Sequence, residues 1–140
     1  MLRCILAWVS VFFAWQVMDF VIHGQLLMST YEATADLWRP EMKYGVLAVV
    51  TLIASAAFTS IYCLLVDRKE IKTGLIFGFL FGIATGVGMG YGTYATQPIP
   101  YNLAISWFLG ATAEATVGGL IVGAILGGGK QKPMEASPSD

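Results

Sequence analysis

Residues 74–90 read GLIFGFLFGIATGVGMG, and residues 111–127 read ATAEATVGGLIVGAILG. In both stretches a glycine or alanine returns at every fourth position, which gives one face of a helix a row of small residues. Lipid provides no hydrophobic drive for helices to associate, whereas small residues let two backbones approach closely. We therefore expect the two rows to face each other in a bilayer; a row that joins two copies of the chain is the alternative. The rows consist of Gly74, Gly78, Gly82, Gly86 and Gly90, and of Ala111, Ala115, Gly119, Gly123 and Gly127.

The composition of the whole chain is that of a membrane protein. Of its 140 residues, 56% are hydrophobic and 12% are charged, and its mean hydropathy is +0.69, whereas a soluble domain has about 25% charged residues. A formal net charge of -1 provides no basic surface, so we expect no nucleic-acid partner. One histidine and two cysteines exclude a disulfide scaffold and a zinc ribbon. The expected partner is the lipid bilayer, and we expect no cofactor.

Four segments are long enough to cross a bilayer. A helix needs about 20 apolar residues to span a hydrocarbon core of about 30 Å, and this length is reached by residues 2–27, 44–66, 73–95 and 103–126. The short links after the second and third segments favour antiparallel neighbours. We predict an all-α, polytopic fold: an antiparallel four-transmembrane-helix bundle over residues 1–127, followed by a disordered cytoplasmic tail over residues 128–140.

The basic residues predict the orientation of the bundle. Six lysines and arginines fall on the side of the two termini, and two fall in the first loop, so the positive-inside rule places both termini in the cytoplasm. Cys4 and Cys63 then both face a reducing compartment, and we expect free thiols rather than a disulfide.

The first outer loop has a helical pattern of its own. Ser29 and Glu32 have the spacing of a capping box, and Tyr31 and Trp38 lie on one apolar stripe that ends before Pro40. We predict a short interfacial helix that rests flat on the outer membrane surface. A surface connector is our interpretation, and a lid over the mouth of the bundle is the alternative.

Alternating glycines extend the third segment over residues 86–93. Part of this stretch, Gly90-Tyr91-Gly92, resembles the filter of potassium channels, in which backbone carbonyls replace the ion's hydration shell. No pore helix precedes it, so we expect instead a slim or bent end of the third helix that leaves a groove near the outer leaflet.

Three ionisable residues fall inside the apolar segments. Asp19 and His23 share one face of the first helix, and Glu114 lies near the middle of the fourth at a similar depth. Charges inside a bilayer cost at least ~2.5 kcal/mol near its centre, so this cluster needs a reason. Three interpretations stay open: a clamp that fixes helix register, a proton or cation pathway, and a metal site of unknown occupancy. The polar residues expected to support the cluster are Gln16, Thr85, Thr112 and Thr116.

The chain resembles a group of small bacterial membrane proteins. The resemblance covers residues 2–126 and rests on the stretch from Met18 to Gly24, the stretch from Tyr31 to Pro40, the glycine-rich third helix, and Ser106-Trp107 at the start of the fourth. The group consists of four-helix proteins of unknown function. The resemblance implies a bacterial inner-membrane location and a four-pass fold, and it assigns no catalytic residue.

The strongest signals in the sequence are therefore packing signals. They favour a non-enzymatic accessory or partner-binding component of the membrane, which self-associates or joins a larger complex. The alternative is a small proton, cation or solute transporter or channel that uses Asp19, His23 and Glu114. A membrane enzyme or metal binder at the same residues is a third interpretation.

Overall fold

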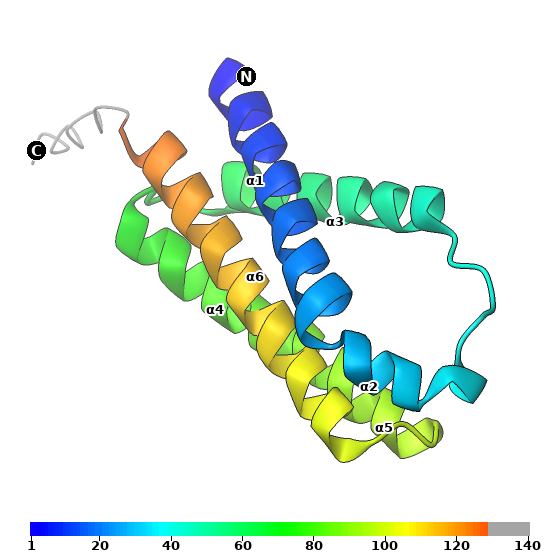
Figure 1. Ribbon diagram of the computed structural model, residues 1–140. Coiled ribbons are helices and arrows are strands. Elements are labelled where there is room, and N and C mark those ends of the chain that lie inside the picture. Colours follow the sequence, from blue (N-terminus) through cyan, green and yellow to red (C-terminus); the bar gives the residue numbers. More distant parts are fainter. Residues whose placement is uncertain (129–140) are drawn as a thin grey trace, which may run out of the picture.

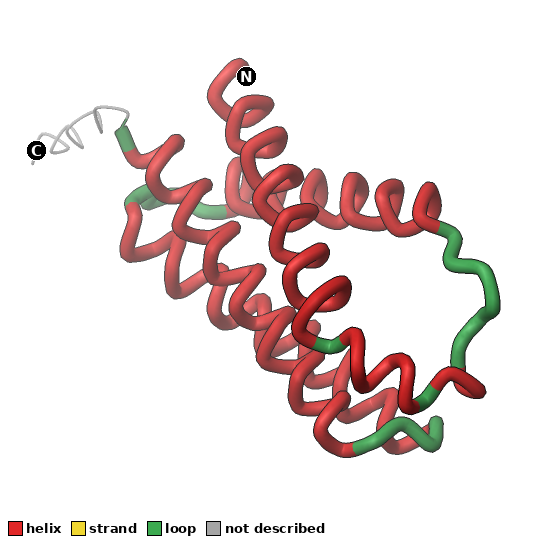
Figure 2. Tube along the Cα trace, viewed as in Figure 1, coloured by secondary structure: helices red, strands yellow, loops and turns green. Residues whose placement is uncertain are grey.

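A computed structural model describes residues 1–128 of the chain. Over this range the chain is helical and contains no strand, as Figure 2 shows. The four long helices are α1 (Leu2–Val21), α3 (Tyr44–Leu65), α4 (Ile71–Val87) and α6 (Tyr101–Gly127). The shorter elements are α2 (Met28–Ala33), α5 (Thr93–Thr96), two π-helical turns (Ile22–Leu26 and Gly88–Gly92) and a 3-10 turn (Ala35–Leu37).

The predicted helical class and the four apolar segments are confirmed. The π turns extend α1 and α4 without a break, so that four helices, Leu2–Leu26, Tyr44–Leu65, Ile71–Thr96 and Tyr101–Gly127, are long and apolar enough to cross a membrane. Their ends differ from the predicted ends by at most two residues. The predicted tail lies outside the described residues, apart from Gly128.

The closest packing in the molecule joins α4 and α6, which run antiparallel and side by side (Figure 1). A Cβ atom added to Gly82 would lie 2.6 Å from the Thr112 Cα atom, and one added to Gly78 would overlap the Ala115 carbonyl. Gly74 and Gly119 face each other in the same way. The small residues of both helices are thus used within one chain, where they allow backbone to touch backbone.

Helix α1 lies against α6 and α3 and completes the core. Its buried residues Ala7, Val11 and Trp15 meet Phe58 and Tyr62 of α3. Two further residues of this cluster, Ala115 and Val122, come from α6. We call these seven residues the inner core, because they lie toward the end of the molecule that carries the N-terminus.

Helix α3 departs from the expected bundle, in which it would lie antiparallel along the whole of α4. Its C-terminal half meets α4 through aromatic rings, with the Phe58 centroid 4.8 Å from that of Phe77 and 5.1 Å from that of Phe81. From there α3 diverges from α4 and α6 toward its N-terminal end (Figure 1). The large rings hold the two backbones apart, whereas the glycines of α4 point to α6. The prediction that α3 lies along α4 is therefore only partly correct.

The first loop is less regular than its pattern predicts. Helix α2 begins after Leu27 with no side-chain cap, and Ser29 lies inside it, so the expected capping box does not form. The helix ends at Ala33 because Thr34 leaves the helical region at φ -122°, and the Thr34 hydroxyl bonds back to the Thr30 carbonyl at 2.8 Å. The predicted continuous helix as far as Trp38 is therefore wrong.

The glycines near the end of α4 form a helix and not an extended filter. Gly88–Gly92 make one π-helical turn in which Gly90 lies against Ala104 and Phe108 of α6. Gly88 and Gly92 face open space. The resemblance to a potassium filter therefore does not extend to the backbone conformation.

The packing of α4 on α6 predicts opposite effects for two glycines of the same helical span. Gly78→Ala places a methyl group into the backbone of α6 and should destabilise the protein by about 1–3 kcal/mol, as overpacking does. Gly88→Ala meets no neighbour and should leave stability equal or raise it by up to about 1 kcal/mol. Unfolding in detergent micelles measures both, and equal stability of the two variants would contradict the packing.

Candidate functional site

The three ionisable residues of the apolar segments, Asp19, His23 and Glu114, lie where α1 crosses α6. Along this contact Trp15 faces Gly118 and Ile22 faces Gly110, so that Cβ atoms added to these glycines would lie 3.0 Å and 3.5 Å from the two side chains. Glu114 lies midway between the two glycines, and Asp19 lies between Trp15 and Ile22. The antiparallel register of the helices therefore brings the two acids to the same level.

The Asp19 carboxyl is the centre of the cluster. The Glu114 carboxyl lies close enough to interact with it, and Asp19 Oδ1 is 4.0 Å from His23 Nε2. The Thr51 hydroxyl of α3 lies 3.3 Å from Asp19 Oδ2 and 3.2 Å from the Leu47 carbonyl oxygen, so its one O–H is shared between these two acceptors. Sequence spacing predicted the proximity of Asp19, His23 and Glu114 but not the donor from α3.

One carboxyl oxygen of Glu114 is unsatisfied. Its Oε1 atom is buried and has no hydrogen-bond partner among residues 1–128. The backbone carbonyl of Glu114 accepts a hydrogen bond of 2.7 Å from Trp15 Nε1, which fixes the helices but does not involve the side chain. A buried polar atom without a partner is costly, so this oxygen marks a site under functional or structural constraint.

A chain of hydrogen bonds joins His23 to Tyr31 of the first loop and to Trp107 of α6. Trp107 Nε1 donates to the Tyr31 hydroxyl at 2.8 Å, and the Tyr31 hydroxyl lies 2.6 Å from His23 Nδ1. Because an indole N–H only donates, the Tyr31 oxygen is an acceptor toward Trp107, and its own O–H remains to donate to His23. We therefore assign the His23 tautomer that accepts at Nδ1 and presents Nε2–H to Asp19.

The turn at the end of α1 positions Tyr31. The π turn Ile22–Leu26 carries His23, and Leu27 is buried against Ile99, Leu103 and Ala104. Because Leu27 is buried there, α2 begins at an angle to α1 that brings Tyr31 next to His23. The rings of Tyr31 and His23 stack, with centroids 6.0 Å apart. Trp38 packs on Tyr31 from the outer side. The predicted interfacial residues Tyr31 and Trp38 thus belong to the site.

The expected supporting residues bond elsewhere. The hydroxyls of Thr85, Thr112 and Thr116 each donate to the carbonyl four residues earlier in their own helices. Gln16 is half-buried on α1 and makes no hydrogen bond to the acids. A threonine hydroxyl inside a helix readily donates to a carbonyl of its own helix, so these residues do not supply donors to the cluster.

The metal interpretation finds no support in the geometry. Within residues 1–128, no group of three histidine, cysteine, aspartate or glutamate side chains is arranged to hold a metal ion. One of the two possible ligand atoms of His23, Nδ1, is already hydrogen-bonded to Tyr31.

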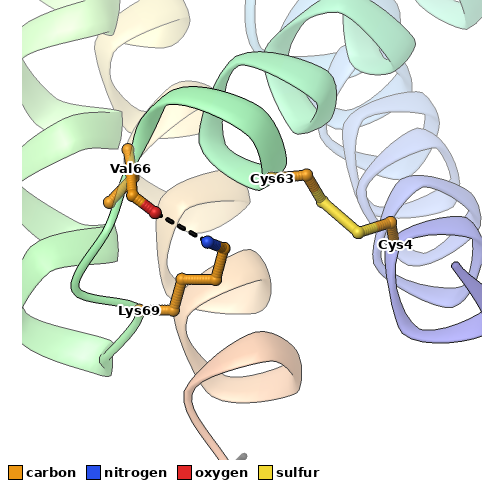
Figure 3. Close-up of a disulfide and its surroundings, with 4 residues drawn as sticks. All are labelled: Cys4, Cys63, Val66 and Lys69. Carbon is orange, nitrogen blue, oxygen red and sulfur yellow. Dashed lines mark hydrogen bonds between the residues drawn. A yellow bond between two sulfur atoms is a disulfide. The ribbon is translucent and has the colours of Figure 1, made fainter. Parts of the chain in front are cut away.

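The expectation of free cysteines is wrong. Cys4 of α1 and Cys63 of α3 form a disulfide, with their Cα atoms 6.5 Å apart (Figure 3). The sequence placed both residues at the same end of the molecule, but compartment alone cannot reveal that the crossing of α1 and α3 brings the Cα atoms within disulfide range.

Comparison with known protein families, curated proteins and solved structures found no match. The resemblance to small bacterial four-helix membrane proteins therefore stays a prediction, and function has to be argued from the site itself.

The assigned tautomer of His23 can be observed directly, because this is the single histidine of the chain. Nitrogen-15 NMR at neutral pH should find a protonated Nε2 and a hydrogen-bonded, unprotonated Nδ1. Tyr31→Phe should remove the hydrogen-bond shift at Nδ1, whereas Tyr44→Phe, on a side chain that is 72% exposed, should leave it unchanged. A protonated Nδ1 in the parent protein would refute the assignment.

Tyr31 also predicts a dependence of stability on alkaline pH. Burial raises the pKa of its hydroxyl above the usual 10.0, and the bond from Trp107 lowers it in part. The unfolded chain therefore loses this proton first as pH rises, so the contribution of Tyr31 is complete below about pH 10 and declines above it. Tyr31→Phe should cost about 1–3 kcal/mol at neutral pH because it strands two polar groups.

The difference in the free energy of unfolding between the parent protein and Tyr31→Phe should then become smaller above about pH 10. Chemical unfolding at a series of pH values measures it, with Tyr44→Phe as the control for tyrosines in general. A gap that is constant from neutral to alkaline pH would contradict the prediction.

Proposed function

We propose that the chain is a four-pass protein of a bacterial inner membrane with both termini in the cytoplasm. Four apolar helices of spanning length support this, as does the excess of six basic residues over two on the side of the termini. The N-terminus and the C-terminal end of α6 lie toward the same end of the molecule (Figure 1). The resemblance to small bacterial four-helix proteins agrees with this location.

We propose further that the protein is a non-enzymatic membrane component whose acid pair, Asp19 and Glu114, binds a proton that enters from the outer side. The observation that carries this proposal is the hydrogen bond between Tyr31 and His23, together with the approach of His23 Nε2 to within 4.0 Å of Asp19; Trp107 holds the Tyr31 hydroxyl in place. Carboxylic acid, imidazole and phenol are all groups that can pass a proton on.

The acid pair is suited to hold the proton. Two carboxylates repel each other at short range, and the buried Oε1 atom of Glu114 has no donor among residues 1–128 to compensate a charge. One proton shared by the pair removes the repulsion. The single donor from Thr51 can stabilise the other carboxyl as the charged partner.

The geometry supports access from the outer side alone. Between the acid pair and the N-terminal end lies the inner core, in which Val11, Phe58, Tyr62 and Val122 are fully buried. Apolar side chains without water do not conduct protons. A bound proton would therefore alter how α1, α3 and α6 meet, and so act on a partner protein or a second copy, rather than cross the membrane directly.

A small proton transporter is the second candidate. It is favoured by the divergence of α3 from α4, because a helix held by few close contacts can move and open the inner half. A purely structural clamp is the remaining alternative, in which the acid pair keeps its proton at every pH.

Infrared difference spectroscopy on proteoliposomes can separate these functions. We expect a band of a protonated carboxylic acid that disappears as the pH is raised, is lost in Glu114→Gln, and is unchanged in Glu32→Gln, an exposed acid of the first loop. Proton flux, followed with an enclosed pH dye, should equal that of empty liposomes.

Each alternative has its own outcome in the same experiment. A band that persists at every pH indicates the clamp, and flux that is lost in Glu114→Gln indicates the transporter. No band at all would mean that the acid pair holds no proton, and the proposal would fail.

A further inference from the structure

The Cys4–Cys63 disulfide lies at the opposite end of α1 from the acid pair. It joins two helices whose cysteines are 59 residues apart in the sequence. Neither the packing of α4 on α6 nor the acid pair requires this covalent link, so its role has to be found in its own surroundings.

The disulfide lines a groove. The groove encloses about 490 Å³ between α1 and α3, and its walls include Met1, Trp8, Thr59, Leu64 and both cysteines. Both cysteines are half-buried, so a small reagent can reach them through the groove. Accessible disulfides are the ones that exchange, whereas fully enclosed ones are inert.

The wall of the groove also contains an unsatisfied polar atom. Thr59 is 2% exposed, and its hydroxyl oxygen is buried without a hydrogen-bond partner among residues 1–128. Buried polar atoms normally have a hydrogen-bond partner. A buried hydroxyl without one is therefore unexpected beside a cross-link that only holds the structure together. It indicates a region that changes its contacts.

Basic residues follow or precede both cysteines, together with two acids. Arg3 precedes Cys4, and Arg68 and Lys69 follow the helix that carries Cys63, between Asp67 and Glu70; Arg68 is paired with Glu70 at 3.2 Å. Figure 3 shows Lys69 close to the end of α3, where its Nζ atom donates to the Val66 carbonyl at 2.7 Å. Nearby cations favour the thiolate, which is the attacking species in thiol–disulfide exchange.

We propose that Cys4 and Cys63 form a reversible thiol–disulfide exchange site whose co-reactant is a dithiol of the compartment that this basic end faces. A thiolate of the dithiol attacks one sulfur of the disulfide and releases the other cysteine as a thiolate. The second thiol of the reagent then attacks the mixed disulfide. Two electrons and two protons pass to the cysteines, and the dithiol becomes a disulfide; the reverse sequence closes the link again.

The state of the link determines how firmly α3 is attached. Apart from the disulfide, α3 is tied to α1 by polar contacts from Trp8 to Ser55 at 3.2 Å and from Thr51 to Asp19 at 3.3 Å. The outer half of α3 already diverges from α4 (Figure 1). Reduction therefore removes the covalent part of this attachment and leaves the inner end of α3 held by the packing of Phe58 and Tyr62, so that the helix holds its donor on Asp19 less tightly.

Alkylation of the protein in membranes tests the exchange site. Membranes treated with dithiothreitol, without denaturant, are alkylated with a maleimide–polyethylene glycol and compared by gel mobility. We expect the maleimide to add to neither cysteine before reduction and to both cysteines after it. When the reduced membranes are treated with a mild oxidant before alkylation, it should again add to neither. Ser60→Ala, in the wall of the same groove, should behave as the parent, and Cys4→Ser should show one addition with or without reductant.

Two results would overturn the proposal. Cysteines that react only after denaturation would mean a static cross-link, and cysteines that both react even after oxidation would mean that no pair forms. The choice of a cytoplasmic dithiol rests on the proposed topology, so a membrane-impermeant phosphine is applied to sealed vesicles of either orientation. Reduction from the outer face alone would refute that topology while it supports the exchange site.

Thermal unfolding gives the second readout. Reduction should lower the melting temperature of the parent and leave that of a Cys4→Ser, Cys63→Ser variant unchanged. An equal melting temperature of oxidised and reduced parent would refute the role of the link in holding α3.

Discussion

The close approach of the α4 and α6 backbones is the constraint on which the rest of the structure depends. Lipid offers no hydrophobic gain when two helices meet, so contact has to come from packing, and only small residues permit it at this distance. Because α6 turns its row of small residues to α4, the neighbouring face with Gly110, Glu114 and Gly118 is presented to α1. The position of Glu114 toward α1 thus follows from the packing of the small residues of α6 against α4.

The polar cluster is tolerated because apolar residues enclose it on two sides. Toward the N-terminal end lies the inner core, and toward the loops lies the cluster around Leu27 and Leu103. Between them the ionisable groups satisfy one another through Tyr31, Trp107 and Thr51. An arrangement of this kind costs less than isolated charges, because the partly exposed Asp19 and His23 side chains each have a polar neighbour within the protein.

Sequence reasoning reached the features that depend on local periodicity. Hydropathy located the four long helices, the four-residue repeat located the packing faces, and counting along the helices placed Asp19 near Glu114. It missed what depends on angles between helices: the divergence of α3, its donor Thr51, and the disulfide. It also missed the turn at Leu27, because the helix begins beside this buried apolar side chain, two residues before the Ser29 that was expected to cap it.

Helix α3 takes part in both the acid site and the disulfide. It lacks small residues toward α4, so aromatic rings set its distance there, and its position relative to α1 depends on a covalent bond at one end and a hydroxyl donor at the other. A helix that is packed along its inner half and diverges along its outer half responds to a change in either part. Protonation of the acid pair and reduction of the disulfide therefore act on the same element, and a partner that contacts α3 would sense both.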